Sequence, residues 1–261
     1  MSLQGEERKQ YILKILAEKG KVNVNDLASE LNVSTETIRK DLDQMDKENK
    51  LKKVYGGAVK ISYDLIEPSQ LSRENVHIEE KRKIGKAAAD LVLDHEVIIV
   101  DEGSTTLQMI MHLSQKKNIT LITNSVPALT LLIDYETKGL FQGTCVFIGG
   151  HVDSTHRRVT GLLAEQFMDH FYVDKAFISI YGITKDYGMT SYDPNEAILT
   201  KKFMKCAREN IVLFDHSKIG IKRYYKVADL KEVDTIVCDK EAPMDWRGTL
   251  ADKNIQWIVA E

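Results

Sequence analysis

VNVNDLASELNVSTETIRKDLDQMDKENKLKK, residues 22–53, is the stretch that decides how the N-terminal part of this chain folds. Apolar residues recur at helical spacing on both sides of a short polar turn at 32–34: Leu27, Ala28 and Leu31 before it, and Ile38, Leu42 and Met45 after it. Asn25 and Ser34 are suitable N-caps for these two helices. With a further helix expected over 6–18, the pattern predicts three helices around one small core, the arrangement of a helix-turn-helix.

The side of the third helix opposite its apolar stripe carries groups suited to reading DNA. Its first turn presents hydroxyls, its next turn presents cations, and LKKVYGGAVK at 51–60 follows as a short basic hairpin. Hydroxyls and amides meet base edges in a major groove, and cations meet phosphates. We expect DNA contacts from Ser34, Thr35, Thr37, Arg39, Lys40 and Gln44 on the helix, and from Lys52, Lys53 and Tyr55 on the hairpin.

Two acidic residues of this helix, Glu36 and Asp43, are unfavourable beside phosphate. They either lie off the contact face or pair with Lys40 and Lys47, each four residues further along the helix. A solvated three-helix cap with ordinary surface charge is the alternative to DNA binding. The compact order of helix, turn and capped helix, followed by a basic hairpin, favours DNA binding over that alternative.

The string VSTETIRKDL followed by KKVYGGA resembles the N-terminal signature of the DeoR family of bacterial sugar-operon repressors. The family pattern is a Val-Ser turn, then Thr-Ile-Arg-basic-Asp-Leu, then a wing that ends Gly-Gly-Ala. The matching residues here are Val33, Ser34, Thr37, Ile38, Arg39, Lys40, Asp41, Leu42, Gly56, Gly57 and Ala58. The resemblance covers nearly the whole chain and implies a winged helix-turn-helix joined to a sensor of a phosphorylated sugar or polyol.

Beyond a segment with a broken pattern, apolar runs and amphipathic stretches alternate to the end of the sequence. A long helix is expected over 77–93. Strand-like runs are 97–100, 119–123, 144–148, 175–180, 211–214, 235–238 and 256–259, and helical stretches include 105–114, 126–135, 162–170 and 195–208. The alternation predicts a larger Rossmann-like α/β domain with a mostly parallel sheet. We expect a DNA-binding domain at 1–60, a linker at 61–75 and a sensor and oligomerisation domain at 76–261.

A candidate ligand site follows the first of these strands, in VIIVDEGSTTLQMIMHL at 97–113. Glycine lets the backbone approach a ligand, and hydroxyls with N–H groups at a helix N-terminus form a cradle for phosphate, although a plain capped helix start has the same pattern. Ligands of open α/β sheets bind beyond the carboxyl ends of the strands, where this loop and the ends of the next two strands fall. The residues expected there are Asp101, Gly103, Ser104, Thr105, Thr106, Asn124, Ser125, Gly149 and Gly150.

The segment EEKRKIGKAAADL ahead of this loop resembles the phosphate-binding front of ribose-5-phosphate isomerases. In those enzymes a lysine before the first helix and the Gly-Ser-Thr loop hold the phosphate, and Lys81 occupies the matching position. Lys201 and Lys218 match later polar positions of the DeoR family and are candidates for the anionic end of a ligand, with a solvated surface charge as the alternative for each lysine. Arg157 and Arg158 follow the double glycine, and the pair is suited to closing over an anionic effector.

Composition narrows the function classes. The net charge is −3, and residues 1–60 carry 12 basic against 10 acidic residues, so geometry rather than charge supports DNA binding. Three separate cysteines match no zinc or CxxC spacing, and His151 and His156 have no carboxylate at metal spacing, so we expect no metal and no cofactor. We find no signal-type segment and no apolar run near the roughly 20 residues that span a bilayer, so we expect a cytoplasmic protein without a membrane partner.

These patterns lead to a homo-oligomer, dimer or tetramer, that binds double-stranded operator DNA. The resemblance implies a repressor of a carbohydrate-utilisation operon that a phosphorylated sugar or polyol releases from its operator. A sugar-phosphate isomerase-like enzyme with a helical cap domain is the alternative, although the sequence has no Gly-x-Ser-x-Gly elbow, Walker loop or Rossmann glycine motif. A DNA-binding architectural protein without a small ligand is a third interpretation.

Overall fold

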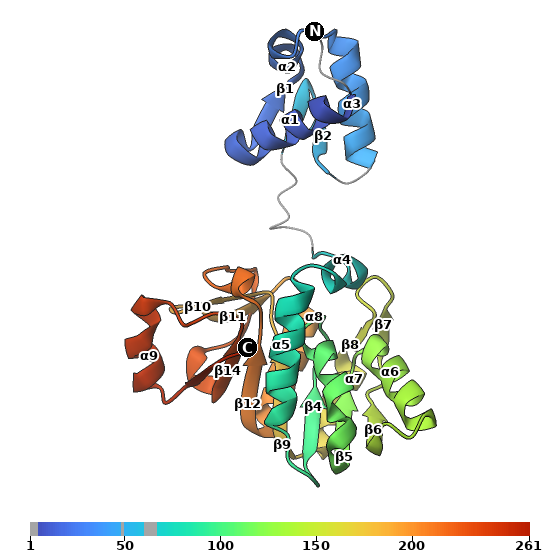
Figure 1. The fold of residues 1–261 in the computed structure, drawn as a ribbon, viewed down its shortest axis with the longest axis vertical. Helices are drawn as coiled ribbons and strands as arrows, with labels where there is room; N and C mark the ends of the chain where they lie inside the picture. The colour runs from blue at the N-terminus through green and yellow to red at the C-terminus, as the bar shows by residue number, and fades with distance from the viewer. Residues whose placement is uncertain (1–4, 48–49, 60–66) are drawn as a thin grey trace. The chain divides into compact units, whose positions relative to one another are not determined.

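The computed structural model describes residues 5–47, 50–59 and 67–261, and the chain divides into two compact units, 1–66 and 67–261. In the first unit (Figure 1), three helices and a small antiparallel sheet of order β1-β3-β2 share one core. The helices are α1 (Gly5–Lys19), α2 (Val24–Glu30) and α3 (Thr35–Lys47), and the strands are β1 (Lys21–Asn23), β2 (Lys52–Val54) and β3 (Gly57–Val59).

The helical spacing of the apolar residues explains this core. Ile38, Leu42 and Met45 of α3 are fully buried, and Leu27 of α2 packs in the same cluster. The predicted helix-turn-helix is therefore confirmed. The cap of α2 differs from the prediction: Asn23, not Asn25, is the N-cap, and its side chain accepts the Asn25 N–H at 2.8 Å, because β1 runs directly into α2 and the helix begins at Val24.

The wing is paired on both of its sides. β3 pairs with β2, its hairpin partner, and with β1, a three-residue strand that the sequence analysis did not predict. The pairing requires glycine at position 57, because a Cβ there would lie 2.0 Å from the Val22 carbonyl oxygen. Gly56 has φ +76°, the left-handed region that glycine adopts without strain, and it forms the turn of the hairpin.

The second unit contains a seven-stranded sheet of order β15-β14-β12-β9-β4-β5-β6, in which every pairing is parallel. Its strands are β4 (Val97–Val100), β5 (Lys117–Thr123), β6 (Gln142–Phe147), β9 (Val173–Ser179), β12 (Ala207–Leu213), β14 (Thr235–Cys238) and β15 (Gln256–Val259). The predicted parallel α/β domain is confirmed, and each apolar run lies on one of these strands.

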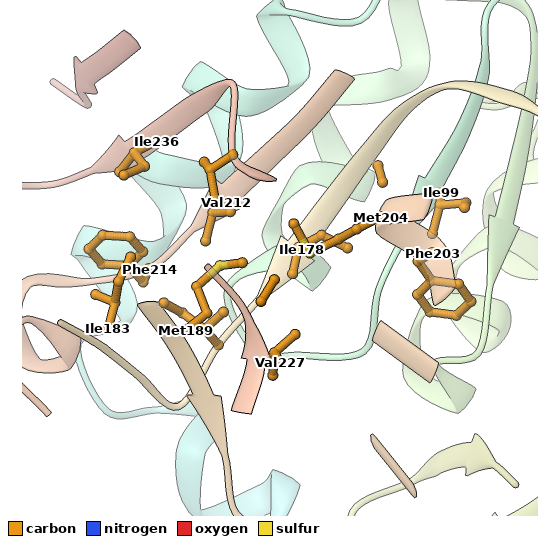
Figure 2. Close-up of a cluster of buried hydrophobic side chains, with 14 of the residues drawn as sticks. Ile99, Ile178, Ile183, Met189, Phe203, Met204, Val212, Phe214, Val227 and Ile236 are labelled. Atoms are coloured by element: carbon orange, nitrogen blue, oxygen red, sulfur yellow. The ribbon is translucent and has the colours of Figure 1, made fainter. Parts of the chain in front are cut away.

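Both faces of the sheet are covered, because successive residues of a strand point to opposite sides. Ile98 and Val100 of β4 pack in the cluster that includes α5 (Ile78–Asp90), η1 (Thr106–Gln115) and α6 (Val126–Thr137). Ile99 points the other way, into the cluster with α8 (Pro194–Cys206) and α7 (Leu162–Phe167). Figure 2 shows this second cluster, where Phe203 and Met204 of α8 lie among side chains of the strands.

Short elements complete the unit, and the sequence analysis did not predict its small strands. They are the hairpin β7 (His151–Asp153) and β8 (Arg158–Thr160), and a sheet of β10 (Gly182–Thr184), β11 (Gly188–Ser191) and β13 (Tyr225–Ala228). The remaining helical turns are η2 (Met168–His170), η3 (His216–Lys218), η4 (Leu230–Glu232), η5 (Met244–Trp246) and α9 (Arg247–Asp252). In the part of the chain that the structure describes, no helix is long and apolar enough to cross a membrane.

The segment expected as a linker, 61–75, is structured in its second half. Residues 61–66 lie outside the described residues. From Glu67 onward the chain belongs to the second unit, where Ser69 caps α4 (Gln70–Glu74) and Gln70 is buried. This segment is part of the second unit rather than a linker because Glu67 and Arg73 form ion pairs with residues of the sheet domain. The hydrophobic pattern of the segment does not reveal such long-range ion pairs.

The order of the strands places a topological switch point, here called the crevice, between β4 and β9. The chain proceeds from β4 outward to β6, then returns to β9 and proceeds outward in the other direction to β15. Loops that leave the carboxyl ends of β4 and β9 therefore diverge, and such a switch point is where open α/β sheets bind ligands.

Candidate DNA-binding face and ligand site

The first turn of α3 is built by its own hydroxyls. Ser34 caps the helix by accepting the Thr37 N–H at 3.1 Å, and the two hydroxyl oxygens lie 2.9 Å apart. Thr35 and Thr37 are half-buried, and Arg39 and Lys40 are exposed in the following turn. The structure therefore groups these predicted DNA contacts at one end of α3, an end suited to entering a major groove.

The acidic residues of α3 have other partners than expected. Glu36 lies 3.9 Å from Arg39, and Asp43 pairs with Lys53 of the wing. Lys53 also donates its backbone N–H to Asp46 at 2.8 Å. Glu36 thus pairs with Arg39 rather than with Lys40, and the Lys47 side chain, the expected partner of Asp43, lies outside the described residues. The ion pair of Asp43 with Lys53 joins α3 to β2.

Gln44, a predicted DNA contact, accepts a hydrogen bond from Lys9 of α1 at 2.7 Å. One turn earlier, Asp41 receives the Arg8 guanidinium through Nε at 2.5 Å and Nη2 at 3.1 Å, and both side chains are largely buried. The arginine of α1 thus holds α3 in place through Asp41. Gln44 is exposed but engaged with α1.

The tip of the wing is fully open to solvent. The solvent-exposed area of Tyr55 is 107% of the reference value for a tyrosine, and Lys52 on the adjoining strand is exposed as well. An aromatic ring held out on a hairpin with cations on its strand is suited to contact a nucleic-acid backbone. The predicted wing residues therefore lie on the surface of the hairpin, with Lys53 partly engaged by Asp43.

In the second unit, the loop after β4 is closed by hydrogen bonds of its own. The Thr106 hydroxyl donates to the Asp101 carbonyl at 2.8 Å and to the Gly103 carbonyl at 3.1 Å. Gly103 has φ +155°, and a Cβ there would lie 2.3 Å from the Ser179 hydroxyl at the end of β9. Ser104 and Thr105 are 5% exposed. The loop is thus pressed against the switch point, as predicted from its sequence.

Of the other predicted residues, Asn124 and Ser125 have structural partners. Asn124 accepts the Glu102 N–H at 3.0 Å and donates to the Val159 carbonyl at 3.2 Å, so it joins the ends of β4, β5 and β8. Ser125 caps α6. Gly149 and Gly150 are exposed and lead into the β7–β8 hairpin.

Two of the predicted lysines come together near Asp215. Lys81 is 4% exposed, and burial lowers its pKa to about 8. Burial also lowers the pKa of Lys218, and the charge of Arg73 acts in the same direction. Because the Asp215 carboxylate acts on both lysines, these ammonium groups share one neighbourhood beyond the end of β12.

The packing of α5 on η1 brings Lys81 level with the loop. A Cβ on Gly85 of α5 would lie 2.6 Å from Gln108 of η1. Helix α5 leads into β4 and η1 leads out of it, so the two run parallel and their N-termini lie at the same end of the sheet. Lys81 and Ser104 each lie four residues before the contacting pair, and they therefore lie at the same end of the sheet.

Arg157 and Lys201 lie elsewhere. Arg157 has a side chain that is 39% exposed and lies 3.9 Å from the Glu74 carboxylate. Lys201 lines a surface hollow between α7 and α8, together with Leu162, Glu165 and Asp169. The structure does not bring these two cations into the group formed by Lys81, Lys218 and the loop.

Arg158, the neighbour of Arg157, is the buried member of the arginine pair, and its partners Glu67 and Tyr181 were not predicted from the sequence. Its side chain is 1% exposed. It donates to Glu102 at 2.8 Å, to both oxygens of Glu67 at 2.8 Å and to the Tyr181 hydroxyl at 3.3 Å. Burial by itself raises the pKa of the Glu102 carboxyl. The positive charges of Arg73 and Arg158 outweigh this effect, so the pKa lies below its ordinary value. A buried network therefore fills the end of β4 and β9.

A second buried group adjoins this network. The Thr200 hydroxyl lies 3.2 Å from Asp101 and 3.1 Å from Glu196, and Ser191 donates to Glu196. Burial, and next the charge of Glu196, raises the pKa of Asp101 well above its ordinary value. Burial, and next the charge of Glu102, raises the pKa of Glu196 to about 8. Burial thus favours the protonated form of both carboxyl groups, and a protonated carboxyl can donate a hydrogen bond to a hydroxyl-rich ligand.

A helix-turn-helix with a wing and a separate α/β domain with a polar crevice define a ligand-responsive DNA-binding regulator. The model of the DeoR-like helix-turn-helix domain matches residues 8–63, and that of the DeoR C terminal sensor domain matches residues 76–240. The chain belongs to the DeoR family. It is accordingly a transcriptional regulator rather than an enzyme, and the isomerase alternative is set aside.

Curated relatives span nearly the whole chain. The HTH-type transcriptional regulator FruR of Bacillus subtilis is 32% identical over 90% of this chain and 91% of its own length. The HTH-type transcriptional repressor GlcR of the same organism is 29% identical over 98% of this chain and 96% of its own length. Among solved structures, ribose 5-phosphate isomerase A of Methanocaldococcus jannaschii is 22% identical over 55% of each chain, with a TM-score of 0.39.

Proposed function

We propose that this regulator represses a carbohydrate-utilisation operon in the cytoplasm as a homo-oligomer, and that a phosphorylated sugar or polyol releases it from its operator. Relatives are named as the transcriptional repressor GlcR and as a putative aga operon transcriptional repressor, which supports repression of sugar genes. The effector binds at the carboxyl ends of β4 and β9, with its phosphate at Lys81, Lys218 and the loop 103–105.

The observation that carries this proposal is the pair of lysines, buried Lys81 and half-buried Lys218, whose charges both interact with the buried Asp215 carboxylate. Burying a charge without enough opposite charge is costly. A phosphate monoester supplies about two negative charges and several acceptor oxygens at neutral pH, which offsets that cost. The loop with Ser104 and Thr105 adds hydroxyls and helix N-terminal N–H groups to the same end of the sheet.

The remainder of the crevice suits hydroxyl groups. Burial raises the pKa of Asp101 and of Glu196 and so favours their protonated, hydrogen-bond-donating forms, whereas Arg73 and Arg158 lower the pKa of Glu102 and favour its accepting, ionised form. A polyol can satisfy both kinds of group. Release of the operator then requires that the effector bind the DNA-incompetent arrangement more tightly than the competent one.

The test is a mobility-shift assay on the DNA upstream of the gene, with calorimetry against pentose and hexose phosphates. Lys40→Ala should weaken operator binding about tenfold and lower the salt dependence, while effector binding stays unchanged. Ser104→Ala should weaken effector binding and leave operator binding intact. Lys205→Ala and Ser114→Ala are exposed controls for charge and hydroxyl removal.

The outcomes separate the possible functions. Loss of both activities in either variant contradicts a division of labour between the two units. Turnover of a sugar phosphate contradicts the regulatory assignment of the crevice. No binding of any phosphate ester by the wild-type protein contradicts the effector class.

A further inference from the structure

The first residue of the second unit reaches into the ligand crevice. Glu67 has a side chain that is only 7% exposed. Both of its oxygens accept from Arg158 at 2.8 Å, and the Tyr181 hydroxyl donates to it as well. Glu102, which shares Arg158 with Glu67, follows β4, and Tyr181 follows β9, so the carboxylate lies at the switch point itself.

A second contact fastens the same segment to the crevice. Lys81, the lysine that the proposed function assigns to the phosphate, donates its ammonium to the Arg73 carbonyl at 2.6 Å. The Arg73 guanidinium lies 3.5 Å from Glu102 and 4.8 Å from the centre of the Tyr181 ring. Both ends of α4 are thus held by groups that line the ligand site.

The charges of the crevice explain why Glu67 is held there. Arg73 and Arg158 are both nearly buried, and Glu102 is the buried carboxylate that the sheet domain supplies. Asp153 and Asp193 lie further from Arg158, at 3.8 and 4.0 Å. Without Glu67, two guanidinium groups would share one close carboxylate. Arg158 Nε and Arg73 Nε are also buried without a hydrogen-bond partner, so the two guanidinium groups can donate further hydrogen bonds to an anion with more acceptor oxygens than a carboxylate.

We propose that Glu67 is an internal competitor of the effector, so that docking of the segment 67–75 and binding of a phosphate ester exclude one another. The segment precedes α5 and follows the end of the first unit, and its release therefore changes the connection between the two units of the chain. This inference rests on the proposed function, because it takes the effector to occupy Lys81 and the crevice.

The consequence for affinity is quantitative. If the docked segment must leave before the effector binds, the observed dissociation constant exceeds the intrinsic one by the reciprocal of the undocked fraction. Weakening the dock raises that fraction. Glu67→Gln keeps the size of the side chain but removes its charge, and it should bind a phosphate ester at least about five-fold more tightly than the wild-type protein.

The experiment uses the full-length protein and two readouts. Calorimetry measures affinity for inorganic phosphate and for a panel of pentose and hexose phosphates. Hydrogen exchange of residues 70–75 is followed with and without each probe. Glu74→Gln is the matched control, since it lies in the same segment but faces Arg157 at 3.9 Å in an exposed pair. We expect tighter binding in Glu67→Gln alone, and faster exchange of 70–75 in the wild-type protein when a probe binds.

Each result decides the matter. Equal affinity of Glu67→Gln and wild type, or exchange at 70–75 that a bound probe leaves unchanged, overturns the competition while leaving the proposed function in place. Absence of binding in the wild type and in Glu67→Gln overturns the proposed function and the competition together. The exchange measurement on the wild-type protein remains valid even where the variant fails to fold.

Discussion

Glu196 and Asp101 are carboxyl groups that folding places almost wholly out of water, at 2% and 1% exposure. Each meets the Thr200 hydroxyl rather than a cation at close range. Glu102, by contrast, lies against Arg158 and Arg73 and stays ionised. A protonated carboxyl group donates a hydrogen bond and an ionised carboxylate accepts one. Such groups side by side can bind a hydroxyl, which is both donor and acceptor.

A pH dependence of stability follows from Glu196. Burial raises the pKa of the Glu196 carboxyl from its ordinary value of 4.5, which holds in the unfolded chain, to about 8 in the folded protein. The folded state holds more protons across that interval, so the free energy of unfolding falls as pH rises through it. The free energy of unfolding can be measured by urea unfolding followed by tryptophan fluorescence. Between pH 6 and 8 it should fall by about 2 kcal/mol less in Glu196→Gln than in the wild-type protein.

Glu79→Gln is the control for this measurement, because Glu79 is exposed and pairs with Arg82 across one helical turn. Glu79→Gln should leave the dependence of the free energy of unfolding on pH as it is in the wild-type protein. An identical slope in Glu196→Gln and wild type would show that this carboxyl does not retain its proton on folding.

Sequence patterns found some residues of the crevice and missed others for a physical reason. Ser104 and Thr105 belong to a local motif, a strand that ends in glycine and hydroxyls, and such motifs are visible in the sequence. Arg158 is buried by Glu67 and Glu102, which lie 91 and 56 residues away. Nothing local distinguishes it from the half-exposed Arg157, so the sequence pattern does not show which arginine of the pair is buried.

At the scale of elements, the orientation of α3 depends on its contact with α1. The apolar stripe fixes which face of α3 is buried, and the Arg8–Asp41 pair adds a directional bond between the helices. Removing one partner of a buried ion pair leaves the other charge uncompensated, which costs about 3 kcal/mol or more. Exposed pairs contribute less than about 1 kcal/mol.

Asp41→Asn should therefore destabilise the first unit by about 3 kcal/mol and weaken operator binding through the loss of helix orientation. Asp43→Asn, whose partner Lys53 is exposed, should change stability by less than about 1 kcal/mol. Hydrogen exchange of the amides of residues 38–45 in the full-length protein measures the opening free energy of α3 directly. Equal protection in the two variants would contradict the role given to Asp41.

The elements that the sequence predicted are those with long, regular patterns. The seven parallel strands are apolar runs buried on both faces, and their predicted ranges agree closely with the observed ones. The missed strands β1, β7 and β10 have three residues each, too few for an alternation to register. η1 lies where a helix was predicted but forms tighter 3₁₀ turns, a distinction that apolar spacing does not report.

At the scale of the whole molecule, the two units have separate hydrophobic cores. One cluster draws all its members from residues 11–58, and the other two draw theirs from residue 84 onward. Each unit therefore carries the apolar burial it needs for its own fold.

A fragment of residues 67–261 should accordingly unfold in urea at nearly the same midpoint as the full chain. Trp246 and Trp257 both lie in this fragment and pack edge to face, so tryptophan fluorescence reports it selectively. The fragment should also bind the same phosphate esters. A midpoint lowered by more than about 1 M would correspond to more than about 1 kcal/mol of lost stability and would show that the two units fold together.

The central position of β3 has a mechanical consequence. The described part of the first unit ends at Val59, in the strand that is bonded to β1 on one edge and to β2 on the other. A load applied along β3 is shared by two ladders, because β1 and β2 are hydrogen-bonded to its two edges. Lys53 of β2 is bonded to Asp43 and Asp46 of α3, so such a load passes to the hairpin and to α3 together.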